Sequence, residues 1–181
     1  MSRQGCSEEL CVLGVDAAAR GPTGYAVVTA AATGLQALTY GSFRPHPAED
    51  TPQRLCSLHR LIAGLLEEFS PHAMAVETVF AAPNAATALK LAEARGVVLL
   101  AAAQAGVAVH SYSPREVKLQ ITGYGGAPKT QVQTMVRQLL GLRSVPESPD
   151  AADALALALC HIFVARTRRP LAEWRSLRPA R

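Results

Sequence analysis

The segment Cys11-Val-Leu-Gly-Val-Asp16 decides how the rest of this sequence is interpreted. It is a short apolar run, rich in valine, that ends in a carboxylate. Such a run predicts a buried β-strand. A carboxylate at the end of a buried strand has to be solvated, paired with a cation or bound to a metal, because burying it bare costs a great deal of free energy. Asp16 is therefore the first candidate functional residue.

Two further strands are expected directly after Asp16. A Gly-Pro-Thr-Gly turn at residues 21–24 precedes an apolar run at residues 25–30, and residues 35–43 form a third β-type segment. The connections between them are short. Because a parallel return needs about a dozen connecting residues or more, these three strands are predicted to form an antiparallel meander.

Helices and strands alternate in the remainder of the chain. Residues 45–52 are expected to be a loop, and leucines at helical spacing from Leu55 to Phe69 predict a helix that Pro71 stops. The elements expected next are a strand at residues 73–79, a long helix at 84–105, a strand at 107–112, and helices at 114–122, 130–140 and 151–166. This order predicts an α/β fold with a mixed five-stranded sheet flanked by helices, and it resembles the ribonuclease H-like architecture.

Composition limits the class of protein. The chain has 181 residues, 49% apolar and 18% charged, which is enough for one domain with a real core. The longest apolar stretch, residues 96–103, is far shorter than a membrane span, and the polar N-terminus has no signal-like apolar region. The four cysteines form no C-x-x-C pair. These features favour a protein of the reducing cytoplasm without membrane contact.

The positive charge is concentrated at the C-terminus. Residues 166–181 hold six arginines and one glutamate, whereas the rest of the chain carries 12 basic and 13 acidic side chains. We therefore expect a flexible N-terminus at residues 1–10, a ribonuclease H-like domain at 11–166 and a basic tail at 167–181. A basic tail suggests a polyanionic partner, although many solvated termini have the same composition.

Three more acids stand out beside Asp16. Glu77 ends the Met-Ala-Val run of the apolar fourth strand, and Asp150 and Asp153 lie on one face at the start of the last helix. Four carboxylates in one cleft repel one another, and divalent cations relieve that repulsion. All-oxygen ligands favour Mg²⁺ or Mn²⁺, and two ions about 4 Å apart can support the hydrolysis of a phosphodiester.

Each acid also has a simpler interpretation when taken alone. Asp150 could cap a helix, because Ser-Pro-Asp is a good helix start. Asp16 could be a turn residue, and Glu77 could pair with an arginine. A glycine-rich loop before Lys129 resembles a nucleotide-binding loop, but proline replaces the required glycine and a helix precedes it. The hypothesis of a metal-dependent nuclease depends on the acids occurring together.

The chain resembles the RuvC family of Holliday-junction resolvases over residues 12–161. The joint order and spacing of several segments carry this resemblance. They are Leu13-Gly-Val-Asp16, Thr23-Gly-Tyr25, Val76-Glu-Thr-Val-Phe80, residues 84–96 (NAATALKLAEARG), Pro114-Arg-Glu-Val-Lys118, Lys129-Thr-Gln-Val132 and Asp150-Ala-Ala-Asp-Ala-Leu-Ala156.

The resemblance implies roles for particular residues. The metal-binding catalytic acids would be Asp16, Glu77, Asp150 and Asp153. Lys118 and Lys129 would hold the scissile phosphate, Arg115 would contact DNA, and Phe80 would enter the junction. Taken alone, the lysines could be solvated and Phe80 could belong to the core.

The resemblance also implies partners. It implies a homodimer paired through the long helix, four-way junction DNA as substrate, two Mg²⁺ or Mn²⁺ ions per site and a complex with a branch-migration helicase. The apolar stripe of the long helix fits subunit pairing and core packing equally well.

One departure from the family pattern is visible. The chain lacks the Pro-Gly that usually follows the first aspartate, and the turn is one residue longer. The leading hypothesis is a structure-selective endonuclease that resolves four-way junctions. The alternatives are a ribonuclease H-like nuclease for RNA or another branched DNA, and a catalytically inactive junction-binding protein.

Overall fold

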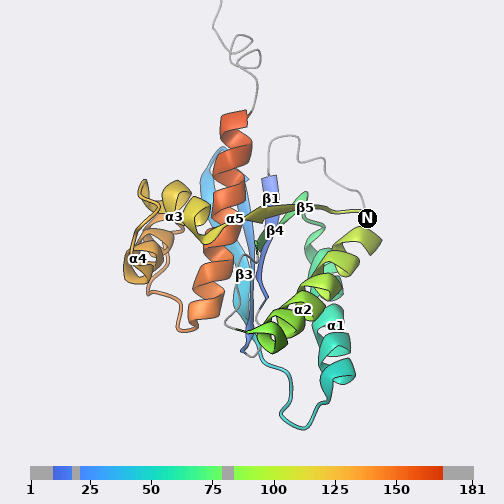
Figure 1. Ribbon diagram of the computed structural model, residues 1–181. Coiled ribbons are helices and arrows are strands. Elements are labelled where there is room, and N and C mark those ends of the chain that lie inside the picture. The colour runs from blue at the N-terminus through green and yellow to red at the C-terminus, as the bar shows by residue number, and fades with distance from the viewer. Residues whose placement is uncertain (1–9, 18–20, 79–83, 169–181) are drawn as a thin grey trace, which may run out of the picture.

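The computed structural model describes residues 10–17, 21–78 and 84–168 (Figure 1). Phe80, nearly all of the expected flexible N-terminus, most of the expected basic tail and part of the unusual turn after Asp16 lie outside these ranges. Among the helices that are described, none combines the length and apolar character needed to cross a membrane.

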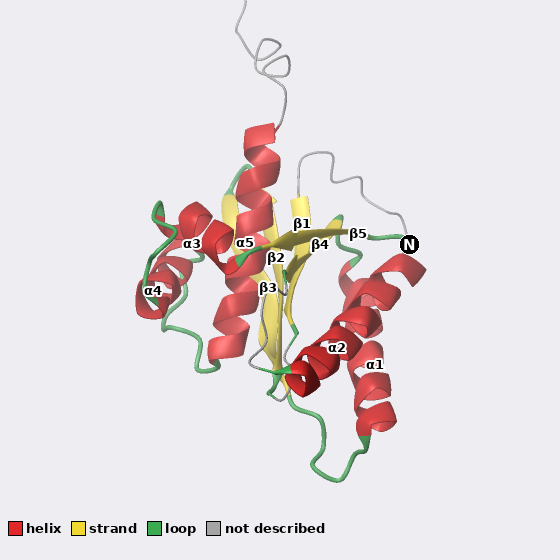
Figure 2. Cartoon of the chain, viewed as in Figure 1, coloured by secondary structure: helices red, strands yellow, loops and turns green. Residues whose placement is uncertain are grey.

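The elements follow the predicted order (Figure 2). Strands and helices are β1 (Leu10–Asp16), β2 (Thr23–Ala31), β3 (Gly34–Phe43), α1 (Thr51–Phe69), β4 (Ala73–Glu77), α2 (Ala85–Gln104), β5 (Ala108–Tyr112), α3 (Pro114–Thr122), α4 (Lys129–Leu139) and α5 (Pro149–Arg168).

One sheet joins all five strands in the order β3-β2-β1-β4-β5. The pairs β1/β2 and β2/β3 are antiparallel, while β1/β4 and β4/β5 are parallel. The mixed five-stranded sheet and its antiparallel meander are therefore confirmed. The first and fourth strands are neighbours, which is the arrangement that the proposed meeting of acids requires.

The start of α1 corrects the sequence analysis. Residues 45–52 were expected to be loop, but the helix already begins at Thr51. The Asp50 side chain accepts a hydrogen bond from the Gln53 backbone N–H at 2.9 Å, and the Gln53 side chain accepts one from the Asp50 backbone N–H at 3.0 Å. This reciprocal cap, with Pro52 in the first turn, starts the helix before its leucines begin.

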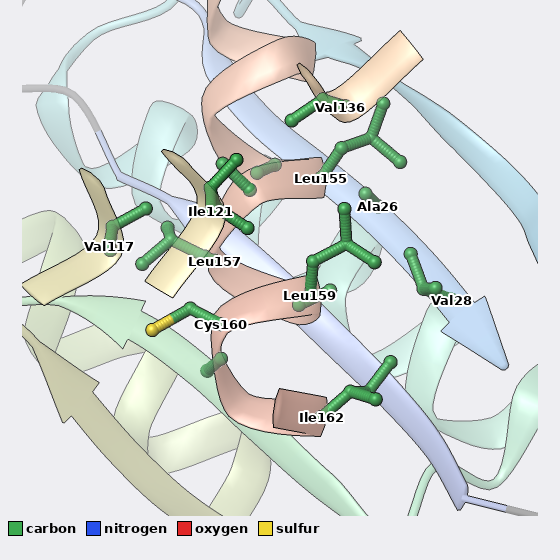
Figure 3. Close-up of a cluster of buried hydrophobic side chains, with 14 of the residues drawn as sticks. Ala26, Val28, Val117, Ile121, Val136, Leu155, Leu157, Leu159, Cys160 and Ile162 are labelled. Carbon is green, nitrogen blue, oxygen red and sulfur yellow. The ribbon is translucent and has the colours of Figure 1, made fainter. Parts of the chain in front are cut away.

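Alternation along β1 divides the core into two layers. Cys11, Leu13 and Val15 pack with buried side chains of α1 and α2. Val12, on the opposite face, packs with α3, α4 and α5, which cover that side of the sheet (Figure 3). Because successive side chains of a strand point to opposite faces, Gly14 and Asp16 belong to the face of α5.

Two glycines allow α5 to lie directly on the sheet. A Cβ atom at Gly14 would overlap the Ala154 carbonyl oxygen, and one at Gly24 would overlap the Asp150 carbonyl oxygen. The opposing positions on α5 are also small, since Ala151, Ala154 and Ala158 are buried there. The first turn of α5 is consequently held against the Asp16 end of β1.

Gly14→Ala is expected to destabilise the protein, because the added methyl group meets helix backbone that cannot move aside. We expect the free energy of unfolding to fall by about 1–3 kcal/mol or more. Urea denaturation measures this change. Gly64→Ala is the control, because a Cβ at this exposed helical position meets no atom within 4 Å. It should raise stability by roughly 0.5–1 kcal/mol, and equal effects of the two changes would contradict this account of the packing.

Candidate active site

Asp16 and Glu77 lie at the ends of two neighbouring parallel strands. The register of β1 and β4 pairs Val15 with Val76, so the two acids follow at adjacent positions. Asp16 shares the face of Val12, and Glu77 shares the face of Ala75. Both carboxylates are therefore on the side of the sheet that α5 covers.

The first turn of α5 brings the other two acids to this place. Gly24, which touches the Asp150 backbone, is also the register partner of Asp16 in β2. Asp153 follows three residues later, on the same side of the helix. Ser148 donates a hydrogen bond to Asp150 Oδ2 at 3.4 Å. The structure thus brings together all four acids that the sequence singled out.

The electrostatic state of the site reflects this crowding. Burial, followed by the charges of Glu77, Asp153 and Asp150, raises the pKa of Asp16 to about 7, and Lys129 opposes this shift. Burial and the charge of Asp153 also raise the pKa of Glu77. Carboxylates that resist ionisation in this way gain from any cation that enters among them.

Lys129 supplies one such positive charge. It is the first residue of α4, and its Nζ atom lies 2.6 Å from Asp153 Oδ2. Burial lowers the pKa of Lys129, but the hydrogen bond and charge of Asp153, with Asp16 and Asp150, outweigh this effect and leave the pKa raised. The amine is therefore firmly protonated beside the acids.

Two cavities adjoin Glu77. One of about 310 Å³ is lined by Asp16, Glu77 and Arg95, among others. The second, of about 190 Å³, is lined by Glu77, Lys118, Lys129 and Asp153. Acids and lysines from five elements therefore border two cavities that share Glu77 and Pro114 at the end of the sheet. This arrangement has room for a phosphate between the carboxylates and the amines.

Two expected DNA-contacting residues are not placed in this region. Arg115 is exposed on the first turn of α3 and lines neither cavity; its side chain lies against Gly125. Phe80 lies outside the described residues. Their expected contacts with DNA stay predictions.

Arg95 is a residue of the site that the sequence analysis did not identify. From α2, its Nη1 donates to the Glu77 carbonyl oxygen at 2.6 Å and its Nη2 donates to Ser111 Oγ at 2.8 Å. One guanidinium thereby joins the ends of β4 and β5 to α2. The signal available in the sequence was an arginine within the largely apolar second half of the long helix.

The donor set fits hard divalent cations by its chemistry, because it consists of carboxylate oxygens. Within the described ranges, however, no three His, Cys, Asp or Glu side chains are gathered closely enough to form a ready metal site. The four acids are near enough for mutual repulsion to shift the pKa of Asp16, while Lys129 contacts Asp153 directly.

The sheet order, the helices on both faces and the acids at the strand ends define a ribonuclease H-like domain. Comparison with known proteins identifies its family. The family model described as "Crossover junction endodeoxyribonuclease RuvC" matches residues 12–161. The chain belongs to the RuvC family of crossover junction endodeoxyribonucleases.

Individual relatives agree with this membership. The chain is 44% identical over 160 residues to the RuvC of Moorella thermoacetica, covering 88% of this chain and 95% of that protein. It is 43% identical over 148 residues to the RuvC of Natranaerobius thermophilus, covering 82% and 92%. The solved structure of Thermus thermophilus RuvC in complex with a Holliday junction substrate matches with a TM-score of 0.82 and 37% identity, over 87% of this chain and 96% of that one.

The metal-free protein is expected to gain stability as the pH falls from about 8 to about 5. Since the pKa of Asp16 is about 7 in the folded state against 3.8 ordinarily, the folded chain holds a proton here that the unfolded chain has released. Urea unfolding in a chelator at both pH values measures this. Asp16→Asn should remove most of the effect, and Glu68→Gln, exposed on α1, should retain it. Stability that rises toward pH 8 would contradict the assignment.

Proposed function

We propose that this chain resolves four-way DNA junctions by hydrolysing phosphodiester bonds in paired, symmetric nicks, as a step of homologous recombination and DNA repair. The observation that carries the proposal is the meeting of Asp16 and Glu77 with Asp150 and Asp153 at one edge of the sheet, in a chain of the RuvC family. The four acids would be the catalytic, metal-binding residues.

Divalent cations fit this role. Metal dependence is a property of the family, and we propose two Mg²⁺ or Mn²⁺ ions held by the four acids. When bound, such ions lower the pKa of water and stabilise the charge that develops on the phosphoryl oxygens. The four acids would hold those ions in position. Burial raises the pKa of Asp16, so its ionised form gains stability from a bound cation.

The two lysines have a complementary role in this proposal. Lys118 and Lys129 border the same cavity as Glu77 and Asp153. A lysine amine is a compact positive charge suited to phosphate oxygens. Lys129 would contact the scissile phosphate while the acids hold metal, and Lys118 would contact it from α3. We further propose, from the family resemblance alone, that Arg115 and Phe80 contact the junction.

Cutting of a synthetic four-way junction tests the activity directly. We expect cutting with Mg²⁺ or Mn²⁺ and none in a chelator. Asp16→Asn should lower the rate about 100-fold or more while junction binding survives. The reason is that the ions that would stabilise the transition-state charge lose a carboxylate ligand. Glu68→Gln is the control. A hybrid duplex cut faster than the junction would favour the alternative nuclease, and no metal-dependent cutting would favour an inactive binding protein.

A homodimer is proposed because α2 leaves apolar surface uncovered. Leu89 is 64% exposed and Leu100 is 52% exposed. Gly96 is exposed between them, and a Cβ there would meet no atom within 4 Å. Spacings of seven and four residues place the three on one face of the helix. The opposite face, with Ala94, Val98, Ala101 and Ala102, is buried in the core. Helix α2 therefore has one face for core packing and a separate face for subunit pairing.

Leu89→Glu combined with Leu100→Glu is expected to convert the dimer to a monomer, because like charges would face one another across the pairing helices. Light scattering after gel filtration measures the mass. Leu119→Glu is the matched control, since this leucine is 50% exposed on α3, and it should leave the dimer intact. A wild-type monomer, or a double variant that remains dimeric, would contradict the proposed interface.

The proposed setting is the cytoplasm. Cys56 and Cys160 are free thiols, which a reducing compartment maintains. Burial, followed by the charge of Glu116, raises the pKa of Cys160 to about 12, so this thiol is unreactive and contributes to core packing.

A branch-migration helicase is proposed as a partner on the family resemblance alone.

A further inference from the structure

A third cavity, of about 280 Å³, lies at the same end of the sheet as the acids but on the side of α1 and α2. Its walls come from the start of β2, the end of β3, the loop that follows it, the start of α1 and the first half of α2. Three cations, Arg44, Arg54 and Lys90, line it together with a single acid, Glu93. We call this cavity the basic pocket.

Within the described residues, none of the cations of the basic pocket forms an ion pair with a carboxylate. Across the described ranges, the one ion pair joins Lys129 to Asp153, on the other side of the sheet. Arg44, Arg54 and Lys90 are all exposed at the pocket. With Glu93 counted, the lining carries two uncompensated positive charges. Like charges held near one another without partners indicate a site for an anion.

The N-terminus of α1, which lies beside the pocket, is already capped by a side chain of the protein. The first turn of α1 is closed by Asp50 through its bond to the Gln53 N–H. Two guanidinium groups and one amine can hold phosphate oxygens through several charge-assisted hydrogen bonds, and the Thr51 hydroxyl in the lining adds a neutral donor.

The basic pocket is close to the candidate active site. Leu91 and Arg95 line the cavity beside Asp16, whereas Lys90 and Ala94 line the basic pocket. Consecutive positions of α2 thus line the two cavities, so the basic pocket adjoins the cavity beside Asp16. Thr23, in the pocket wall, precedes Gly24, the register partner of Asp16.

We propose that the basic pocket binds a backbone phosphate of the junction close to the scissile phosphate. This inference rests on the proposed function, and it names a DNA contact on the side of the sheet opposite Lys118 and Lys129. A contact on each side of Asp16 would fix the direction of the strand across the acids.

The pocket is tested by measuring junction binding with fluorescence anisotropy at a series of salt concentrations. A chelator is present throughout, so that the junction is bound but not cut. The variant Arg44→Gln/Arg54→Gln/Lys90→Gln should bind about tenfold more weakly or worse, since bonds to a charged group are lost. The slope of log affinity against log salt should fall by about 1. An unchanged melting temperature shows that the variant is folded. Each single change is compared with Arg60→Gln, an exposed arginine of α1 outside the pocket, which should have little effect.

A methylphosphonate scan locates the contact. Neutral linkages are placed one at a time at successive positions on both sides of the cut, and the linkage that meets the pocket should weaken wild-type binding and leave the triple variant unaffected. If the wild type binds and cuts but the triple variant behaves like Arg60→Gln, the pocket proposal is overturned and the proposed function stands. If inorganic phosphate occupies the pocket and no linkage is sensitive, the site serves a small anion and the proposal also fails. A wild-type chain that neither binds nor cuts junctions would overturn both proposals.

Discussion

Direct backbone contact between α5 and the strands β1 and β2 is the constraint on which the candidate site depends. At Gly14 and Gly24 no side chain separates the strands from the helix, and these glycines face the backbone of Ala154 and Asp150. At this short separation, the first turn of α5 carries Asp150 and Asp153 to the end of β1. Larger residues at the two glycine positions would move the helix away, and four acids distant in the sequence would no longer share one site.

The same packing sets the electrostatic character of the site. Bringing Asp16 under α5 buries it among three other acids, so the pKa of Asp16 rises to about 7. Carboxylates arranged in this way oppose the stability of the folded chain at neutral pH. The protein partly offsets this by placing Lys129 against Asp153. Such a cluster of carboxylates gains from any additional positive charge placed among them.

Much of the site followed from local patterns in the sequence. An acid at the end of an apolar strand is unusual enough to be noticed at Asp16 and Glu77, and Ser-Pro-Asp marks the start of α5. Arg95 could not be found in this way, because its partners are a backbone carbonyl of β4 and a hydroxyl of β5. The early start of α1 was missed because the helical pattern of its leucines begins later than the Asp50 cap.

The sequence by itself determined the order of strands and helices, the acids and lysines available for chemistry, and the resemblance to a family, because periodicity, caps and motifs are local properties of the chain. Only the tertiary structure decided which face of the sheet the acids share and how closely α5 approaches them. It also decided that Arg44, Arg54 and Lys90 surround one pocket beside the site. These features arise from contacts between elements far apart in the chain, and they depend on strand register and helix packing, which local sequence patterns do not specify.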